Sequence, residues 1–116
     1  MDNPKLSIIT PVYNRPELLI RSVKSVLSQS FRDFELLIID DFSDIPVELS
    51  LKSIHDERLR IYRMDKKAPN VGTLRKKACQ MARGEIIVIQ DSDDVMAKDR
   101  LRVTNEFFNQ NPEFGV

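Results

Sequence analysis

Short apolar runs alternate with amphipathic stretches along the chain, and this alternation predicts its secondary structure. Apolar or alternating runs rich in β-branched residues predict four strands, at 6–10, 34–39, 59–63 and 86–90. Between and after these runs, apolar residues recur every three or four positions, which predicts helices. The helices are expected from Asn14 onward, at about 48–54, at 73–83 and at about 98–109. A further strand is expected to begin at Phe114.

Proline, glycine and capping residues predict where several of these elements begin or end. Pro11 lacks a backbone N–H and should halt the first strand. Asn14 is a typical helix cap, and Glu17, three residues later, can close a capping box with it. Gly84 is placed as the stop of the third helix, and Pro112 as the end of the fourth.

The run at 34–39 is apolar at all but one position, which indicates burial on both faces, as in a parallel sheet covered by helices. Strands that alternate with helices favour right-handed crossovers between parallel strands. The arginines at 59–63 are expected on the outward face of their strand. The predicted fold class is α/β, with a Rossmann-like, open and mainly parallel sheet and flanking helices.

Charge and composition exclude several classes of function. Lys and Arg together number 18, as do Asp and Glu, so no overall field would attract nucleic acid or an anionic membrane. The apolar runs are far shorter than the ~20 residues that cross a bilayer, so no membrane segment is expected. The single cysteine, Cys79, rules out an internal disulfide and, with no signal-like N-terminus, favours the cytoplasm.

Five aspartates directly follow two of the predicted strands: Asp40, Asp41, Asp91, Asp93 and Asp94. Ligands of an open parallel sheet bind beyond the carboxyl ends of its strands, so these side chains are expected to converge on one edge. Crowded acids are costly unless a cation compensates for them. Asp91 and Asp93 point to the same side of an extended segment, which suits a hard cation such as Mg²⁺ or Mn²⁺.

Acids at strand ends also serve as helix caps and turn formers, which is the alternative for any one of them. The cluster as a whole exceeds what capping needs, and it therefore favours a metal site. An EF-hand calcium loop beginning at Asp91 is excluded, because its sixth position would be Met96 in place of glycine and its twelfth Arg102 in place of glutamate.

Six segments of the chain carry a more specific pattern: LSIITPVYNR (6–15), SVKSVLSQ (22–29), FRDFELLIIDDFS (31–43), NVG (70–72), ARGE (82–85) and QDSDD (90–94). Their order and spacing resemble family 2 glycosyltransferases of the GT-A fold, over nearly the whole chain. The resemblance implies an inverting transferase that takes a sugar from a nucleotide-diphosphate donor, commonly a UDP-sugar. It also implies Mn²⁺ or Mg²⁺ as the cofactor.

The resemblance further implies a nucleotide-binding role for residues at the ends of the first two strands. Thr10, Pro11 and Tyr13 would line the base pocket. The Tyr13 ring would lie beside the base, and Asp41 would hydrogen-bond the edge of the base.

The acidic segment after 86–90 would bind the rest of the donor. The resemblance implies that Asp91 and Ser92 meet the ribose or the sugar. Asp93, the second acid of an Asp-x-Asp motif, would ligate the metal. Asp94 fits either role, and Asp91 is a further candidate metal ligand.

Asn70, Gly72 and Arg75 fall in the segment where the family contacts the nucleotide and the diphosphate, and an arginine suits phosphate geometry. The spacing after Gly72 is shorter than in many relatives. The alternative for Arg75 is a solvated helix face that it shares with Lys76 and Lys77.

A GT-A domain usually continues for roughly another hundred residues, which supply the acceptor site and the catalytic base. We therefore expect residues 1–116 to be the nucleotide-diphospho-sugar-binding half of such a domain, truncated before the acceptor-binding part. The catalytic base is expected beyond Val116. This half by itself is expected to bind donor and to transfer nothing.

Three other functions share features with this chain. A receiver-like phosphoacceptor domain is also a parallel α/β domain with clustered acids, but it needs its acidic pair after the first strand. A sugar nucleotidyltransferase needs a glycine-rich phosphate loop soon after that strand, and no glycine precedes Gly72. A non-catalytic module that merely binds nucleotide remains open.

The remaining candidates have structural interpretations. His55 is expected on the surface of the short helix, and Cys79 in the core as a small apolar residue. The aromatic side chains expected in the core, or between helix and sheet, are Phe31, Phe34, Phe107 and Phe108.

Overall fold

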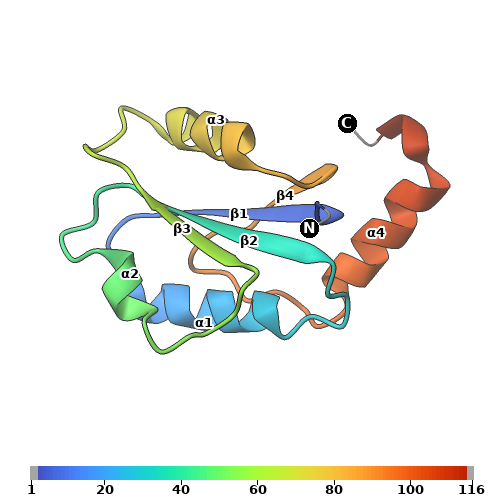
Figure 1. The fold of residues 1–116 in the computed structure, drawn as a ribbon, viewed down its shortest axis with the longest axis horizontal. Coiled ribbons are helices and arrows are strands. Elements are labelled where there is room, and N and C mark those ends of the chain that lie inside the picture. Colours follow the sequence, from blue (N-terminus) through green and yellow to red (C-terminus); the bar gives the residue numbers. More distant parts are fainter. Residues whose placement is uncertain (1–2, 115–116) are drawn as a thin grey trace.

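The computed structural model describes residues 3–114, which form one sheet with helices on both faces (Figure 1). Its strands are β1 (Leu6–Val12), β2 (Phe34–Asp40), β3 (Leu59–Arg63) and β4 (Ile86–Ile89). Its helices are α1 (Pro16–Leu27), α2 (Val47–Ser50), α3 (Val71–Met81) and α4 (Arg100–Gln110), followed by the 3-10 helix η1 (Pro112–Phe114). The strands pair in parallel in the order β3-β2-β1-β4. The predicted α/β class with an open parallel sheet is therefore confirmed.

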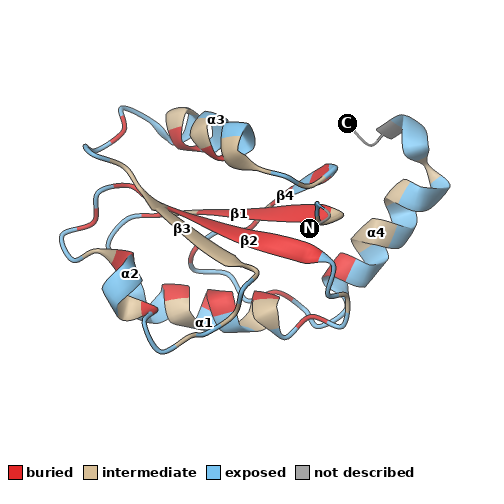
Figure 2. Cartoon of the chain, viewed as in Figure 1, coloured by how far each residue is buried: buried red, intermediate tan, exposed pale blue. Residues whose placement is uncertain are grey.

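The sheet lies between two helical layers, with α3 on one face and α1 and α2 on the other (Figure 1). Successive side chains of a strand point to opposite faces, so β1 and β2 contribute to both halves of the core. Leu6 and Ile8 of β1 pack on the side of α1, whereas Ile9 packs with Leu74 and Ala78 of α3. Every residue of β2 is buried, which confirms the two-sided burial expected of it (Figure 2).

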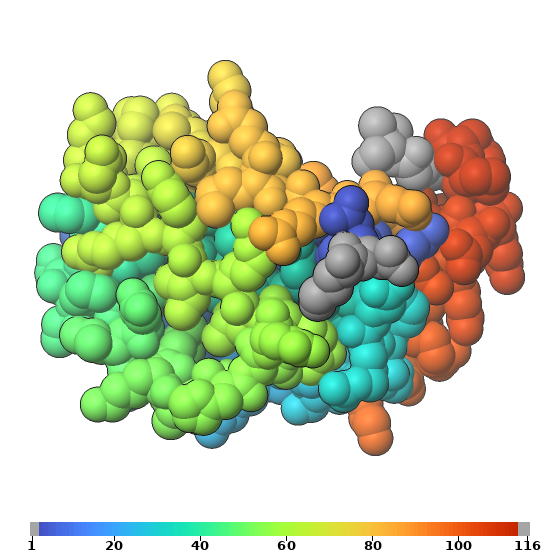
Figure 3. Space-filling model, viewed as in Figure 1, coloured from blue at the N-terminus to red at the C-terminus, as the bar shows by residue number. Residues whose placement is uncertain are grey.

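The segment after β4 runs back beside α1 to the opposite end of the sheet. Gln29, just after α1, holds this segment in place. Its Nε2 donates to the Ala97 carbonyl oxygen at 2.6 Å, and its Oε1 accepts from the Leu101 backbone N–H at 3.0 Å. The helix α4 therefore starts near the amino ends of the strands and projects from one end of the molecule (Figure 1, Figure 3).

The first strand does not end at Pro11, contrary to the expectation from its missing N–H. β1 continues to Val12, and Pro11 lies opposite Ile39 of β2. The Ile9 carbonyl oxygen points towards β4, because it accepts from the Gln90 N–H just after that strand. Backbone groups two residues apart in a strand point to the same side, so the Pro11 nitrogen also faces β4. Pairing with β4 stops at Ile9, so the ladder loses no hydrogen bond at the proline.

The expected helix cap at Asn14 is also wrong. α1 begins at Pro16 after Arg15, and no side-chain hydrogen bond within residues 3–114 caps it. Asn14 instead has a left-handed backbone, with φ of 53°, and pairs with Asp44. Its Oδ1 accepts from the Asp44 N–H at 2.8 Å, and its Nδ2 donates to the Asp44 carboxylate at 3.1 Å. A contact between two loops has replaced the local cap, so Glu17 has no capping box to close.

Other element boundaries differ by a few residues from the predicted ones. α2 ends at Ser50, β4 ends at Ile89, and α3 already begins at Val71 because Asn70 caps it. Phe114 ends η1 and does not begin the expected strand, and the other positions of that strand, 115 and 116, lie outside the described residues. In the part of the chain that the structure describes, no helix has the length and apolarity needed to cross a bilayer.

Gly84 lies where the chain passes close to β1, and not at the stop of a helix. α3 ends at Met81, and Gly84 has no positive φ. A Cβ atom on Gly84 would lie 2.6 Å from the Ser7 nitrogen and 2.6 Å from the Ser7 Oγ. The glycine is therefore required by the close approach of two backbone segments.

Two arginines of β3 neutralise acids buried in β2, instead of sharing an outward face as expected. Arg60 and Arg63 are three positions apart and so lie on opposite faces of the strand. Arg60 pairs with Glu35 at 2.6 Å, and Arg63 pairs with Asp40 at 2.7 Å. Glu35 is 5% exposed and Asp40 is fully buried, and burial of either carboxylate without a partner would be strongly destabilising.

The Glu35 carboxylate is the centre of a buried network. It accepts hydrogen bonds from the Ser7 hydroxyl and the Arg83 backbone N–H, both at 2.6 Å. Burial alone would raise the pKa of Glu35, but the hydrogen bonds from Ser7, Arg83 and Arg60 outweigh it and hold the pKa below its ordinary value of 4.5. The Ser7 hydroxyl oxygen accepts in turn from the Gly84 N–H at 2.7 Å.

Several single side chains differ from expectation. Cys79 is exposed on α3 and does not lie in the core. His55 is exposed, as expected, but it lies in a loop and not in a helix. Phe107 is 48% exposed, whereas Phe31, Phe34 and Phe108 are buried or partly buried against the main core, as expected.

Replacing Gly84 with alanine should destabilise the fold. The added methyl group would overlap the backbone of β1, so we expect the free energy of unfolding to fall by about 1–3 kcal/mol. Gly72→Ala is the matched control, since a Cβ atom there would approach a side-chain atom, the Asn70 Oδ1, at 3.1 Å, and not the backbone of a neighbouring strand. Urea unfolding of both variants measures the difference, and equal losses would contradict the close-approach explanation.

The lowered pKa of Glu35 should make the fold less stable in acid. The carboxylate stabilises the folded state fully above its ordinary pKa of 4.5, and this contribution is lost as the pH falls through the lower folded value. In Glu35→Gln the unfolding free energy should therefore change less between about pH 5 and about pH 3 than in the wild type. Denaturant unfolding at several pH values tests this, with the exposed Glu113→Gln as control. A Glu35→Gln profile as steep as the wild-type profile would rule out this assignment.

Candidate functional site

A cleft opens at the carboxyl ends of the strands, on the face covered by α3. Its volume is about 500 Å³. The residues that follow β1, β2 and β4 form one side of it, and the start of α3 with the preceding loop forms the other. Its lining includes Pro11, Tyr13, Arg15, Asp41, Lys67, Ala68, Asn70, Arg75, Asp91, Ser92 and Asp93.

At one end of the cleft, a buried carboxylate lies beside an aromatic ring. Asp41, which follows β2, is 3% exposed. Its Oδ1 accepts from the Ala68 N–H at 2.7 Å, and its Oδ2 accepts from the Lys67 ammonium at 2.6 Å. The Lys67 Nζ also lies 4.4 Å from the centroid of the Tyr13 ring. This end of the cleft therefore combines a flat apolar surface with a strong hydrogen-bond acceptor.

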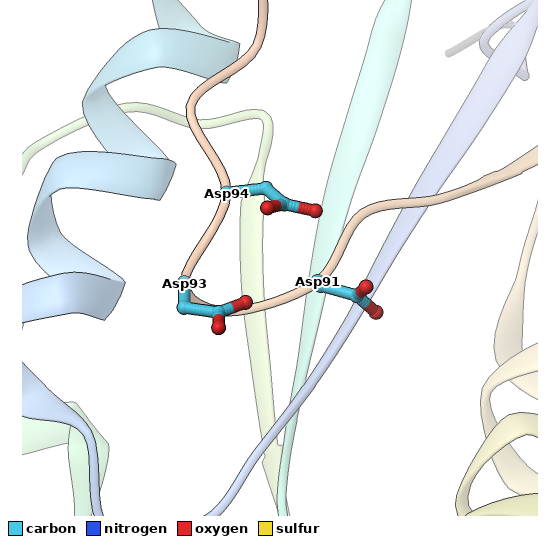
Figure 4. A group of neighbouring side chains, drawn as sticks. All are labelled: Asp91, Asp93 and Asp94. Atoms are coloured by element: carbon cyan, nitrogen blue, oxygen red, sulfur yellow. The ribbon is translucent and has the colours of Figure 1, made fainter.

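Three carboxylates gather in the loop after β4 and project to the same side of it (Figure 4). Asp91, Asp93 and Asp94 are exposed, and each places a carboxylate oxygen within 4.8 Å of the other two. Hard divalent cations prefer oxygen ligands of this kind, so the donor set fits one Mg²⁺ or Mn²⁺ ion. Asp93 pairs with Arg15 at 3.1 Å. These three acids, which we call the acidic loop, converge as the sequence indicated.

Gln90, which is 2% exposed, anchors the acidic loop from within the protein. Its Nε2 donates to the Asp94 carbonyl oxygen at 2.9 Å and to the Ser22 hydroxyl oxygen at 3.3 Å. The Ser22 hydroxyl donates in turn to the Asp91 carbonyl oxygen at 3.3 Å. The acceptors in the loop are backbone carbonyls, so these bonds leave its carboxylates available for a ligand.

The start of α3 contributes the opposite wall of the cleft. Asn70 caps the helix, because its Oδ1 accepts from the Thr73 N–H at 2.9 Å and from the Thr73 hydroxyl at 3.2 Å. Arg75 is exposed and lines the cleft, while the two lysines that follow it do not. Gly72 lies outside the cleft lining, although it belongs to the same turn of the helix.

Two residues expected near the ligand lie elsewhere. Thr10 is 1% exposed and points to the α1 face of the sheet, away from the cleft, because side chains alternate along β1. Asp40 accepts from the N–H groups of Ser43 and Val47 and from the Arg63 guanidinium. Burial would raise the pKa of Asp40, but these hydrogen bonds outweigh it and keep the pKa below its ordinary value. Asp40 therefore supports the fold, and it does not face the cleft.

Four residues of the site were not indicated by the sequence reasoning: Arg15, Lys67, Ala68 and Gln90. Lys67 reaches Asp41 from 26 positions away, and Arg15 reaches Asp93 from 78 positions away. For Arg15 and Gln90 a signal existed, since both lie inside the quoted motifs at 6–15 and 90–94. Lys67 and Ala68 lie in a loop outside those motifs, and no local pattern marks them.

The family model described as "Glycosyl transferase family 2" matches residues 7–116. The chain belongs to this family. An uncharacterized family relative, a glycosyltransferase of Rickettsia conorii, is 35% identical over 112 residues, which make up 96% of this chain and 18% of that protein.

Solved structures share the fold of this family 2 chain. Residues 1–349 of S. aureus TarS, in complex with UDP-GlcNAc, match with a TM-score of 0.85 and 26% identity, over 91% of this chain and 31% of that one. The mannosyltransferase PcManGT from Pyrobaculum calidifontis, in complex with GDP-Man and Mn²⁺, matches with a TM-score of 0.81 and 21% identity, over 91% of this chain and 32% of that one. The expected GT-A type of fold is thus confirmed, and the receiver-like alternative is not favoured. The chain spans only 18% to 32% of the length of these three proteins.

Gln90→Ala should destabilise this family 2 chain by loosening the acidic loop. The change leaves the Asp94 carbonyl oxygen without its donor, so we expect a loss of about 1–3 kcal/mol in the free energy of unfolding. Gln80→Ala, at an exposed position of α3, is the matched control and should change stability by less than about 0.5 kcal/mol. Chemical denaturation of both variants measures this. Similar losses in the two would show that Gln90 does not anchor the loop.

Proposed function

We propose that the chain is the donor-binding part of an inverting glycosyltransferase that takes a sugar from a nucleotide-diphosphate donor, with a UDP-sugar as the expected donor. One observation carries the proposal. A buried carboxylate beside an aromatic ring lines the cleft after β2, and the exposed carboxylates of Asp91 and Asp93 line it after β4, with β1 between these two strands. A nucleotide sugar has a flat base with N–H donors at one end and a metal-binding diphosphate towards the other. The ligand and the cleft therefore match in their chemistry.

The nucleoside would bind at the Asp41 end of the cleft. Tyr13 is 41% exposed, so its ring can stack with a base, and Pro11 also lines the cleft with apolar surface. The Asp41 carboxylate would accept a hydrogen bond from an N–H on the base edge. Asp91 and Ser92 would meet the ribose or the sugar. TarS, which is 26% identical over 91% of this chain, was solved with UDP-GlcNAc, and this supports a uridine nucleotide as the ligand.

The diphosphate and its metal ion would bind at the acidic loop. Asp93, with Asp91 and Asp94, would hold Mn²⁺ or Mg²⁺, and such an ion neutralises the departing diphosphate. Arg15 pairs with Asp93 and would release it to the metal. Arg75 reaches the cleft with a guanidinium that suits phosphate oxygens. PcManGT, which shares the fold, was solved with Mn²⁺, in agreement with a divalent ion.

Asn70 and Gly72 would act through the start of α3. The Asn70 side chain fixes the first turn of the helix, and that turn borders the expected position of the diphosphate. Gly72 lies in the same turn, where a Cβ atom would come within 3.1 Å of the Asn70 Oδ1. We therefore assign these two residues to positioning the wall of the cleft.

The acceptor site and the catalytic base would lie beyond Val116. This assignment fits a chain that spans 18% to 32% of the proteins it resembles. Residues 1–116 would then bind donor without transferring its sugar, and transfer by the isolated chain to any acceptor would contradict that part of the proposal. A cytoplasmic location fits the single cysteine, Cys79.

Calorimetric titration of UDP with and without Mn²⁺ tests the proposal. We expect Mn²⁺ to tighten UDP binding by at least about tenfold, or 1.4 kcal/mol, because the ion joins the diphosphate to the acidic loop. Asp93→Ala should abolish this gain and leave only the weak binding made at the Asp41 end.

Asp33→Ala is the matched control, because Asp33 is an exposed aspartate that precedes β2, at the opposite end of the sheet. This variant should keep the full gain from Mn²⁺. Equal loss of the gain in both variants would exclude a specific role for Asp93. UDP binding that does not respond to Mn²⁺ would favour the non-catalytic nucleotide-binding module.

A further inference from the structure

Lys67 contacts both groups to which the proposed function assigns the nucleobase. Asp41 has both carboxylate oxygens engaged, Oδ1 by the Ala68 N–H at 2.7 Å and Oδ2 by the Lys67 ammonium at 2.6 Å. The same ammonium lies 4.4 Å from the centroid of the Tyr13 ring. One side chain thus covers both groups that the proposed function assigns to the base.

We propose that Lys67 masks the nucleobase site and must swing aside before a base can bind, an inference that rests on the proposed donor-binding function. A base that stacks on Tyr13 and donates to Asp41 requires the volume now held by the Lys67 ammonium. The base and the lysine therefore compete for one place, and the affinity for the base is reduced by the stability of the Lys67–Asp41 pair.

Of the two partners in this pair, Lys67 is the one free to move. Its side chain is 52% exposed, so the ammonium can be hydrated as soon as it leaves the carboxylate. Asp41 is held by two hydrogen bonds. Its carboxylate accepts from the Ala68 backbone N–H, and its own backbone N–H donates to the Val12 carbonyl oxygen at 2.8 Å. A ligand can therefore displace the lysine without moving the strand end.

The mask also determines what a ligand must supply. Once Lys67 leaves, the Asp41 Oδ2 is a nearly buried anionic oxygen without a donor, and leaving it so is costly. A base with a ring N–H, such as uracil, restores a hydrogen bond to that oxygen and offsets the loss of the lysine. A ligand that only stacks on Tyr13 would displace the lysine without this compensation.

Titration with uridine, followed by NMR chemical shifts, tests the mask. Uridine is neutral, so removal of the lysine charge does not change its long-range attraction to the cleft, as it would for UDP. Lys67→Met removes the ammonium and should tighten uridine binding about three- to tenfold. This factor corresponds to the free energy of a partly exposed ion pair, or slightly more. Lys67→Ala also uncovers the ring and should gain at least as much.

Two controls separate the mask from a general effect of charge or folding. Lys67→Arg keeps a cation within reach of Asp41 and should bind uridine as weakly as the wild type. Lys66→Met removes one positive charge from the neighbouring exposed position and should leave uridine affinity unchanged. Thermal unfolding of each variant confirms that the fold is retained.

The result that overturns the mask is uridine affinity that is unchanged or weaker in both Lys67→Met and Lys67→Ala. If the wild type then still binds UDP more tightly with Mn²⁺, the proposed function stands and the mask alone is wrong. If the wild type binds neither uridine nor UDP with Mn²⁺, the proposed function and the mask are both wrong.

Discussion

Burial of β1 and β2 on both faces is the constraint on which the cleft depends. Each buried Leu or Ile side chain contributes about 1.5–3 kcal/mol, and a shift of register by one residue would turn these side chains to the wrong layer. The register that keeps them covered pairs Val12 with Asp40. The next residue, Asp41, then donates its N–H to the Val12 carbonyl oxygen at 2.8 Å. The ends of the two strands are thus locked together, and the polar residues after them share one edge.

The paired acids of β2 and of the cleft fall into two groups with different counterions. The two acids buried within β2 are paired with arginines of β3, on a neighbouring strand, and these pairs are part of the folded core. Asp41 and Asp93 are paired instead with Lys67 and Arg15, whose side chains are each 52% exposed. An ion pair whose cation is half exposed is weaker than an enclosed pair, and that cation exchanges more readily with water or a ligand. The cations that can leave their carboxylates are therefore those in the cleft. The ion pairs of β2 and β3 can stabilise the fold while the carboxylates of the cleft remain accessible to a ligand.

Prediction from the sequence succeeded where local pattern and burial agree. The bounds of β3 were predicted as observed, and β2 was predicted to within one residue, because the alternation and the apolar run reflect the faces that these strands bury. It failed where a distant contact decides local structure. Asn14 has the residue type of a cap, but its amide pairs with Asp44 across 30 positions. Gly84 resembles a helix stop, but the nearby backbone of β1 is what excludes a side chain there.

Local patterns in the sequence were enough to predict the α/β class, the alternation of helices with parallel strands, and the grouping of Asp91, Asp93 and Asp94, because periodicity and close spacing are local properties. Which of the acids can reach a ligand in the cleft depends on tertiary contacts. Tertiary structure buried Asp40 beneath a loop, turned Thr10 to the α1 face, and brought Lys67 onto Asp41. These outcomes depend on which loops meet when the sheet closes, and a charge becomes fixed or exchangeable only through the neighbours and the exposure that folding gives it.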